Sequence, residues 1–267
     1  MTVITLLTDF GTQDGYVGTM HGVILRLNPA ATVLDLCHDV LPQDVAGAAF
    51  ILSTAYPYFA PDAIHVVVVD PGVGSERRAI ALRTERGIFV APDNGVLSYV
   101  LARESCEAMV ELSNPEYWLA QVSQTFHGRD VFAPVAAHIS LGVPLRDLGA
   151  PVEDPAQLPI PEPRLSGNGC IAGQVVHVDH FGNLITNIPR ELLPQGPDVR
   201  IRVAGHLIAG PTMAYAAAAD GELLALIGSS GNLEVAVRNG SAASALGTGR
   251  DAEVVISLAG SEDKARD

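Results

Sequence analysis

The fold is indicated first by residues 64–77, Ile64-His-Val-Val-Val-Val-Asp70-Pro-Gly-Val-Gly-Ser-Glu-Arg77. Its apolar run, Ile64 to Val69, is too short for a helix and contains four consecutive valines. β-branched side chains lose rotamer freedom in helices and fit a pleated surface, so the run predicts a strand. Because apolar and polar residues do not alternate in it, we expect a strand covered on both faces, as in the centre of a parallel sheet.

Strands and helices alternate along the first half of the chain. Apolar residues recur at helical spacing in two segments, and short apolar runs lie before and between them. Right-handed crossovers make strands parallel in such an arrangement, so the sequence predicts an N-terminal α/β domain with a mostly parallel central sheet. The expected elements are strands over Val3 to Leu7 and Thr32 to Leu36, helices over Tyr16 to Leu27 and Asp44 to Phe59, and a hairpin of Ala79 to Thr84 with Ile88 to Ala91.

The composition changes after residue 150. Five prolines fall between positions 151 and 163, and no hydrophobic period survives there, which predicts a linker over 151–166 between domains 1–150 and 167–260. Short apolar runs separated by glycine turns then predict a smaller antiparallel β-barrel domain, with one short helix over Met213 to Ala219. A polar tail, 261–267, follows.

The charge balance limits the partners that we expect. The formal net charge is -14, whereas nucleic acids and anionic membrane surfaces attract clustered Lys and Arg, so we expect neither partner. The single lysine, Lys264, lies in the polar tail, so the folded part has no amine for a Schiff base or a phosphate loop. The three cysteines lie far apart, which argues against a disulfide framework and a thiolate metal site.

The N-terminal residues have no basic region and no long apolar run. No stretch reaches about 18 uncharged apolar residues, the length that a membrane-spanning helix needs. We therefore expect neither a signal peptide nor a transmembrane helix, and we expect a cytoplasmic protein.

Carboxylates recur where the predicted strands end, at Asp9, Asp39, Asp70 and Asp93. The carboxyl ends of parallel strands meet at one edge of a sheet, so several of these groups can face one cleft. Because Mg²⁺ prefers oxygen ligands, one interpretation is a magnesium site for phosphoryl hydrolysis. Another is recognition of ribose hydroxyls or of a cationic ligand. Each aspartate taken singly also suits a turn cap.

Two further polar stretches stand out. His127 lies in Phe126-His-Gly-Arg-Asp130, directly before a predicted helix, where it can act as a base, an orienting group or an ordinary loop histidine. In the second domain, Asp179-His-Phe181-Gly-Asn183 sets an aromatic ring beside an amide. That pair suits a nucleobase and its ribose, but it also suits a hairpin turn.

Taken together, these stretches resemble the S-adenosyl-L-methionine (SAM) hydrolases, also called SAM hydroxide adenosyltransferases, which are relatives of the fluorinating and chlorinating enzymes. The resemblance covers about residues 3 to 258, and it implies an N-terminal α/β domain followed by a β-barrel domain. It also implies a homotrimer with ligand sites between the N-terminal domain of one subunit and the C-terminal domain of the next. The matching motifs are Thr8-Asp-Phe-Gly11, Asp70-Pro-Gly-Val-Gly74 with Arg77, Phe126-His-Gly-Arg-Asp130 and Phe181-Gly-Asn183.

The resemblance implies roles for individual residues. Asp70, Arg77 and His127 match the catalytic triad of the family. Asp9 matches the aspartate that holds the ribose hydroxyls. The other positions that the resemblance implies in substrate binding are Asp14, Phe126, Asp179, Phe181, Asn183, Ser229, Glu234 and Val237.

The implied reaction is attack of an activated water or hydroxide at the ribose C5′ of SAM, which forms adenosine and L-methionine without a metal or an organic cofactor. The halogenating relatives carry a tyrosine at the position of Asp70 and a long insertion where this chain has only Glu85-Arg-Gly87. An aspartate suits a water site and repels a bare halide, which favours hydrolysis over halogenase-type substitution. A magnesium phosphohydrolase, a nucleoside-binding module without catalysis and a structural trimer are the alternatives.

Overall fold

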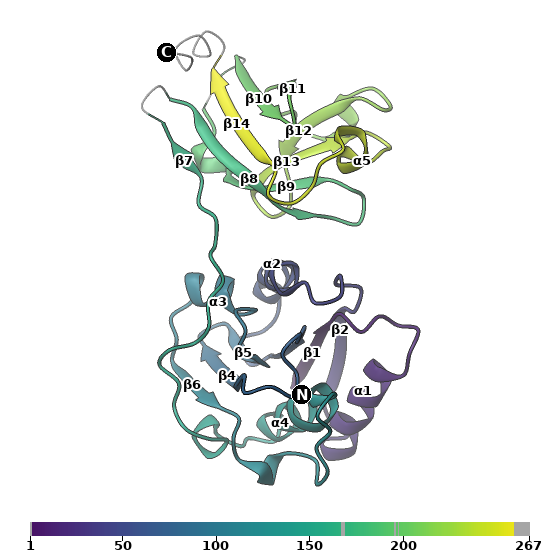
Figure 1. The fold of residues 1–267 in the computed structure, drawn as a ribbon, viewed down its shortest axis with the longest axis vertical. Helices are drawn as coiled ribbons and strands as arrows, with labels where there is room; N and C mark the ends of the chain where they lie inside the picture. The colour runs from purple at the N-terminus through teal and green to yellow at the C-terminus, as the bar shows by residue number, and fades with distance from the viewer. Residues whose placement is uncertain (1, 167–168, 195, 197, 259–267) are drawn as a thin grey trace. The chain divides into compact units, whose positions relative to one another are not determined.

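The computed structural model describes residues 2–166, 169–194, 196 and 198–258. The polar tail predicted over 261–267 lies outside the described residues. The chain divides into two compact units, Met1–Ile160 and Pro161–Asp267, each with its own sheet (Figure 1). The division falls inside the segment 151–166 that the prolines predict as a linker.

The first unit is built on a six-stranded sheet with the order β2-β1-β3-β5-β4-β6. β1 (Val3–Thr8) lies between β2 (Thr32–Cys37) and β3 (Ile64–Val68), and the three strands are parallel. β3 also pairs in parallel with β5 (Gly87–Pro92), so the valine run occupies the interior of the sheet and every residue of β3 is buried. The expectation of a strand covered on both faces is confirmed.

Helices cover both faces of this sheet. On one face, α1 (Tyr16–Leu27) and α4 (Ala133–Ser140) share a core with Ile64, Val66 and Val68 of β3. On the other face, α2 (Val45–Ala55) and α3 (Ser98–Arg103) share a second core with Val67 and Val69. Successive side chains of a strand point to opposite faces, so one valine run contributes to both cores.

An antiparallel hairpin forms the other side of the sheet. β4 (Ala79–Thr84) pairs antiparallel with β5 and with β6 (Ala108–Glu111), which confirms the predicted hairpin and leaves the sheet mostly parallel. Short 3-10 helices of the first unit are η1 (Tyr56–Tyr58), η2 (Pro115–Tyr117) and η4 (Leu145–Asp147), and the second unit has η5 (Arg190–Leu192).

The segment after His127 is not a regular helix from its start. Gly128–Phe132 forms a π-helical turn, η3, before α4 begins. Pro134 has no N–H and cannot donate to the carbonyl of Asp130, which instead accepts the Leu119 N–H at 2.9 Å. Wide turns of this kind occur often at functional sites.

The second unit is an antiparallel sheet in which strands follow the path β11-β10-β14-β8-β9-β13-β12, with β7 paired to β8. A bridge between Thr212, after β11, and Leu226 of β12 joins the two ends of this path. The sheet is therefore nearly closed, in agreement with the predicted barrel. The strands are β7 (Arg164–Leu165), β8 (Ile171–Val178), β9 (Leu184–Pro189), β10 (Val199–Val203), β11 (His206–Ala209), β12 (Leu223–Ile227), β13 (Asn232–Val237) and β14 (Glu253–Leu258).

The helix predicted over Met213 to Ala219 is wrong. Only one 3-10 turn, η6 (Tyr215–Ala217), forms there, and Met213 is 97% exposed. The alanine run has helix propensity but no apolar stripe to bury, and short helices need tertiary packing to persist. A short helix that the sequence analysis missed, α5 (Ala242–Leu246), is capped by the Ser241 hydroxyl, which accepts the Ser244 N–H at 3.1 Å. In the described part of the chain no helix is long and apolar enough to cross a membrane.

Substitution of a residue in the centre of the first unit tests how much that unit depends on β1. Leu6 is 0% exposed, and we expect Leu6→Ala to lower the free energy of unfolding by about 2–5 kcal/mol because it leaves a cavity. The only tryptophan, Trp118, packs against the core of this unit, so its fluorescence during denaturation reports on the first unit. Leu141→Ala, at a site that is 57% exposed, is the control and should change the free energy by less than about 0.5 kcal/mol. Equal effects of the two substitutions would contradict this account.

Candidate functional site

Two neighbouring strands bring carboxylates to one edge of the first sheet. Asp9 directly follows β1, and Asp70 lies two residues after β3. β1 and β3 are parallel neighbours, and Thr8 is paired with Val68 at their carboxyl ends. The two loops therefore start side by side, at the edge where open α/β sheets place their ligands.

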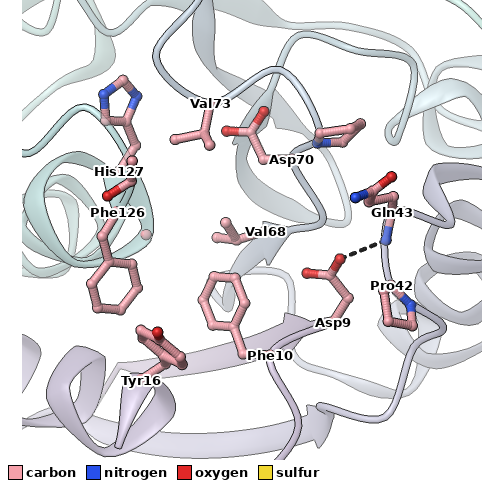
Figure 2. Close-up of a pocket in the computed structure, with 13 residues that line it drawn as sticks. Asp9, Phe10, Tyr16, Pro42, Gln43, Val68, Asp70, Val73, Phe126 and His127 are labelled. Carbon is pink, nitrogen blue, oxygen red and sulfur yellow. Dashed lines mark hydrogen bonds between the residues drawn. The ribbon is translucent and has the colours of Figure 1, made fainter. Parts of the chain in front are cut away.

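A pocket of about 420 Å³ opens at this edge, a size that suits a small molecule (Figure 2). The rings of Phe10, Tyr16 and Phe126 gather at one side of it, with centroids 5.1 to 5.9 Å apart. Asp9 and Asp70 also line the pocket. Aromatic faces beside carboxylates suit a ligand that has apolar surface, hydroxyl groups and positive charge.

Arg77 connects Asp70 to His127. Its Nε lies 3.0 Å from both carboxylate oxygens of Asp70, and its Nη2 lies 2.5 Å from Asp70 Oδ2 and 2.8 Å from His127 Nδ1. The side chains of Arg77 and Asp70 are only 11% and 5% exposed, and exclusion of water strengthens such charged hydrogen bonds. The structure thus brings together the three residues predicted as a triad, with the arginine in the middle.

The contact with Arg77 determines which nitrogen of His127 carries the proton. A guanidinium has only donors, so His127 Nδ1 accepts and the proton of the neutral ring is on Nε2. Burial and, after it, the charge of Arg77 hold the pKa of His127 below its ordinary value of 6.5, against the opposite pull of Asp70 and Asp130. His127 is therefore neutral at pH 7, with Nε2 as a hydrogen-bond donor.

Two features fix the loops that carry this triad. Gly74 has φ of +77°, and a Cβ there would collide with the carbonyl oxygen of Gln124, so only glycine lets the Asp70 loop approach the loop before His127. Asp130, which is buried, accepts the Ser123 N–H at 2.8 Å and is also paired with Arg129. Burial raises the pKa of Asp130, but these bonds outweigh it and hold that pKa below its usual range.

Asp9 is oriented by the loop that follows β2. Its Oδ2 accepts the backbone N–H of Gln43 at 2.7 Å, the dashed line in Figure 2. Gln43 adopts φ of +67°, a conformation that non-glycine residues seldom take, and it lines the pocket together with Pro42. Asp14, by contrast, is exposed in the turn before α1 and is not among the residues that line the pocket.

The other two aspartates at strand ends do not line this pocket. Asp39 is exposed after the edge strand β2. Asp93 accepts from Arg78 Nε at 2.8 Å and from the Ala156 N–H at 2.7 Å, and so holds the segment that leaves the first unit. Across the residues that the structure describes, no group of three or more His, Cys, Asp or Glu side chains is placed to hold a metal ion.

In the second unit, the stretch from Asp179 to Asn183 forms a tight turn. The Asp179 carboxylate accepts the backbone N–H groups of Phe181 and Asn183 and the side-chain amide of Asn183, each at 2.9 Å. The Asn183 residue is 5% exposed, whereas Phe181 is 72% exposed. The turn therefore holds the amide firmly and presents the ring to its surroundings.

The remaining predicted positions of the second unit lie around the hairpin of β12 and β13. Glu234 is buried and accepts a hydrogen bond of 2.5 Å from the Tyr215 hydroxyl. Burial raises the pKa of Glu234, as does the charge of Asp179, whereas the Tyr215 bond lowers it. Ser229 is exposed in the turn, and Val237 is packed in the core of the unit.

Sequence reasoning missed several residues around these sites. Phe10 and Tyr16 flank the glycines of the first loop, and that position could have indicated the pocket wall. Tyr215 lies in an alanine run without any period or motif, so the sequence contained no signal for its bond to Glu234.

Comparison with known proteins gives related sequences and structures. The sequence profile of the SAM hydroxide adenosyltransferase N-terminal domain matches residues 4–149, and that of the C-terminal domain matches residues 173–255. An (R)-S-adenosyl-L-methionine hydrolase of Salinispora tropica is 44% identical over 256 residues, which cover 91% of this chain and 93% of that protein. A fluorinase of an Actinoplanes species is 29% identical, with 70% and 72% of the two chains covered. The crystal structure of an uncharacterized conserved protein from Thermotoga maritima superposes with a TM-score of 0.88 at 39% identity, over 95% of this chain and 99% of that one.

Removal of the Arg77 charge tests the electrostatic account of His127. We expect Arg77→Met to raise the pKa of His127 toward or above 6.5, because the repulsive cation is lost while Asp70 and Asp130 remain. An NMR titration of the imidazole signals measures the shift. His138, whose pKa is also lowered by burial but without Arg77, is the internal control and should not move. A His127 pKa that stays the same or falls would refute the assignment.

Proposed function

The chain belongs to the SAM hydroxide adenosyltransferase family, and on that premise we infer that it is a SAM hydrolase, which forms adenosine and L-methionine. The observation that carries this function is the hydrogen-bonded series Asp70–Arg77–His127. Its two outer members, Asp70 and His127, line the pocket together with Asp9. Four curated relatives at 38–44% identity have the same activity in their names.

The chemistry sets what the protein must supply. An oxygen–carbon bond forms between water and the ribose C5′ while the C5′–S bond breaks, and the sulfur keeps the bonding pair. The sulfonium leaves as a neutral thioether and needs no proton. Catalysis therefore consists of holding the water in line with the C–S bond and accepting its proton.

The contacts suggest how the triad divides this work. His127 Nδ1 already accepts from Arg77, so Asp70 is the group that takes the proton of the water. His127 orients the water through Nε2–H. Arg77 orients the Asp70 carboxylate and stabilises the hydroxide character that develops on the water.

The acidic lining suits a cationic substrate. Asp9 uses one carboxylate oxygen for the Gln43 N–H and retains acceptor capacity for two ribose hydroxyls. Two carboxylates in one pocket also attract the sulfonium charge. Phe126 lines this pocket, and Asp14, which does not, stays a proposed substrate contact.

We also propose that the assembly is a homotrimer in which a neighbouring subunit contributes Asp179, Phe181, Asn183, Ser229, Glu234 and Val237 to the substrate site. The family resemblance supports this arrangement. Mixing Asp70→Asn and Asn183→Ala chains tests it, because mixed trimers would contain intact sites and recover activity that neither variant has alone. Sedimentation of the native protein as a monomer would overturn it. The cytoplasmic location stays a prediction.

The identity of the nucleophile and the configuration of the substrate extend the proposal. Asp70 at the water position disfavours a halide, so chloride should add no chlorinated product. The curated relatives are named (R)-S-adenosyl-L-methionine hydrolases. The L in that name already gives the configuration of the methionine α-carbon, so the (R) refers to the sulfonium sulfur. We expect the same preference here, and separate incubation with each sulfonium epimer tests it.

The first experiment is incubation of the chelator-treated protein with SAM, followed by chromatography of the products. We expect adenosine and methionine in equal amounts. Adenosine binding without turnover would instead support a nucleoside-binding module, and activity that requires added Mg²⁺ would support the phosphohydrolase interpretation.

Substitution of Asp70 and Asp9 separates rate from affinity. Asp70→Ala should lower kcat by about 10²- to 10⁴-fold with little change in KM, since it removes the proton acceptor. Asp9→Ala should mainly raise KM, by about 10-fold or more, since it removes charged hydrogen bonds to the ribose. Asp62→Ala is the control, because Asp62 is exposed before β3, at the opposite end of that strand. An unchanged kcat in Asp70→Ala would refute the assignment.

A further inference from the structure

We propose that His38 is a positioning residue that holds the loop Thr8–Gly11 in the shape that binds the ribose. The proposal rests on the proposed function, because Asp9 is the ribose-binding group of this loop. His38 directly follows β2, and only 5% of its surface is exposed. It lies outside the lining of the pocket, so it acts through the loop and not on the substrate.

His38 contacts both ends of the loop. Its Nδ1 lies 2.9 Å from the hydroxyl oxygen of Thr8, and its carbonyl oxygen accepts the Gly11 N–H at 2.8 Å. The same Thr8 oxygen accepts the Phe10 N–H at 3.2 Å. Asp9 is therefore enclosed between two points that are both tied to one buried residue.

The direction of the His38–Thr8 bond depends on the tautomer of the ring. The Thr8 oxygen accepts the Phe10 N–H in either case, and its hydroxyl donates to His38 Nδ1 when the proton of the ring is on Nε2. His38 Nε2 lies 3.0 Å from Asp35 Oδ1, within ion-pair distance although the atoms are not aligned for a hydrogen bond. Asp35 also contacts His21 of α1 at 2.7 Å. A carboxylate on the Nε2 side favours the tautomer that lets Nδ1 accept.

The segment that begins with His38 supplies a third contact. Gln43, five residues later in the same loop, donates its N–H to the Asp9 carboxylate. Residues 9–11 lie between β1 and α1, beyond the hydrogen bonds of strand and helix. Contacts from the 38–43 segment therefore orient both the backbone and the carboxylate of the ribose-binding loop, and binding depends on such preorganisation.

β1, which contains Thr8, also contains a matched control for the Thr8–His38 pair. The Thr5 hydroxyl oxygen of β1 lies 2.8 Å from His65 Nδ1, in the same type of buried Thr–His pair. His65 packs on Phe89, with ring centroids 5.1 Å apart, and the pair joins β1 to β3 within the sheet. Loss of the Thr5–His65 bond therefore affects the core without affecting the loop.

Substitutions that shift the side-chain polar group test the role of His38. Asn places an acceptor near the Nδ1 position, whereas Gln places its amide near the Nε2 position. We expect His38→Asn to retain the KM of the wild type. His38→Gln and Thr8→Val should each raise KM for SAM and the Kd for adenosine by about three- to ten-fold, with kcat changed less than about two-fold. Thr8→Val also removes the acceptor of the Phe10 N–H, so the double variant Thr8→Val/His38→Gln should show the increase of Thr8→Val alone and no more.

Thr5→Val separates positioning from core stability. It should lower the Tm as Thr8→Val does, but leave KM and the adenosine Kd unchanged. The proposal is overturned if Thr8→Val leaves KM at the wild-type value, or if His38→Asn and His38→Gln raise KM equally. Should His38→Gln fail to fold, Thr8→Val and Thr5→Val decide the question.

The adenosine measurement keeps this proposal distinct from the function. A wild-type protein that binds adenosine without hydrolysing SAM would refute the hydrolase, while a weaker adenosine affinity in Thr8→Val would still support the role of His38. Turnover by the wild type together with unchanged affinity in both His38 variants would refute the positioning role alone.

Discussion

A buried guanidinium that faces a carboxylate on one side and an imidazole on the other is the interaction on which the site depends. Burying charges is costly unless each finds partners, and here Arg77 donates to Asp70 with two of its nitrogens and to His127 with one. Its guanidinium also lies over the ring of Phe132, 5.4 Å from the centroid. The same contacts that offset the cost of burial orient the Asp70 carboxylate and define the tautomer of His127.

The triad keeps this geometry because neighbouring loops are themselves held. Asp130 anchors the turn that precedes His127, and the absent N–H of Pro134 opens the helix into a wide turn there. Gln43 orients Asp9 from a backbone conformation that is seldom adopted. Strained or irregular backbone at several points around one pocket is typical of a site whose groups are positioned before the substrate arrives.

The relatives of this chain include proteins named as hydrolases and as fluorinases, and in the proposed reaction the charge of Asp70 distinguishes water from a halide. Asp70 lies where a nucleophile would approach the ribose in the proposed reaction. A carboxylate attracts the hydrogens of water and can accept one, but it repels an anion. The more distant similarity to a fluorinase, 29% against 44% for a hydrolase, agrees with a shared framework and a different nucleophile.

The sequence alone determined the class of fold and the family. A valine run without alternation indicates burial on both faces, and β3 is an interior strand. The order of the four motifs along the chain indicated the family. What the sequence could not supply was which strand ends are neighbours, because hydrophobic periodicity reports the buried face of an element and not its partner. Asp9 and Asp70 line the same pocket because β1 pairs with β3. Asp39 and Asp93 do not line it, since Asp39 follows an edge strand and Asp93 is paired with Arg78. Likewise, the proton position on His127 and the bond between Tyr215 and Glu234 depend on contacts between residues that are distant in the sequence and are brought together by the folded chain.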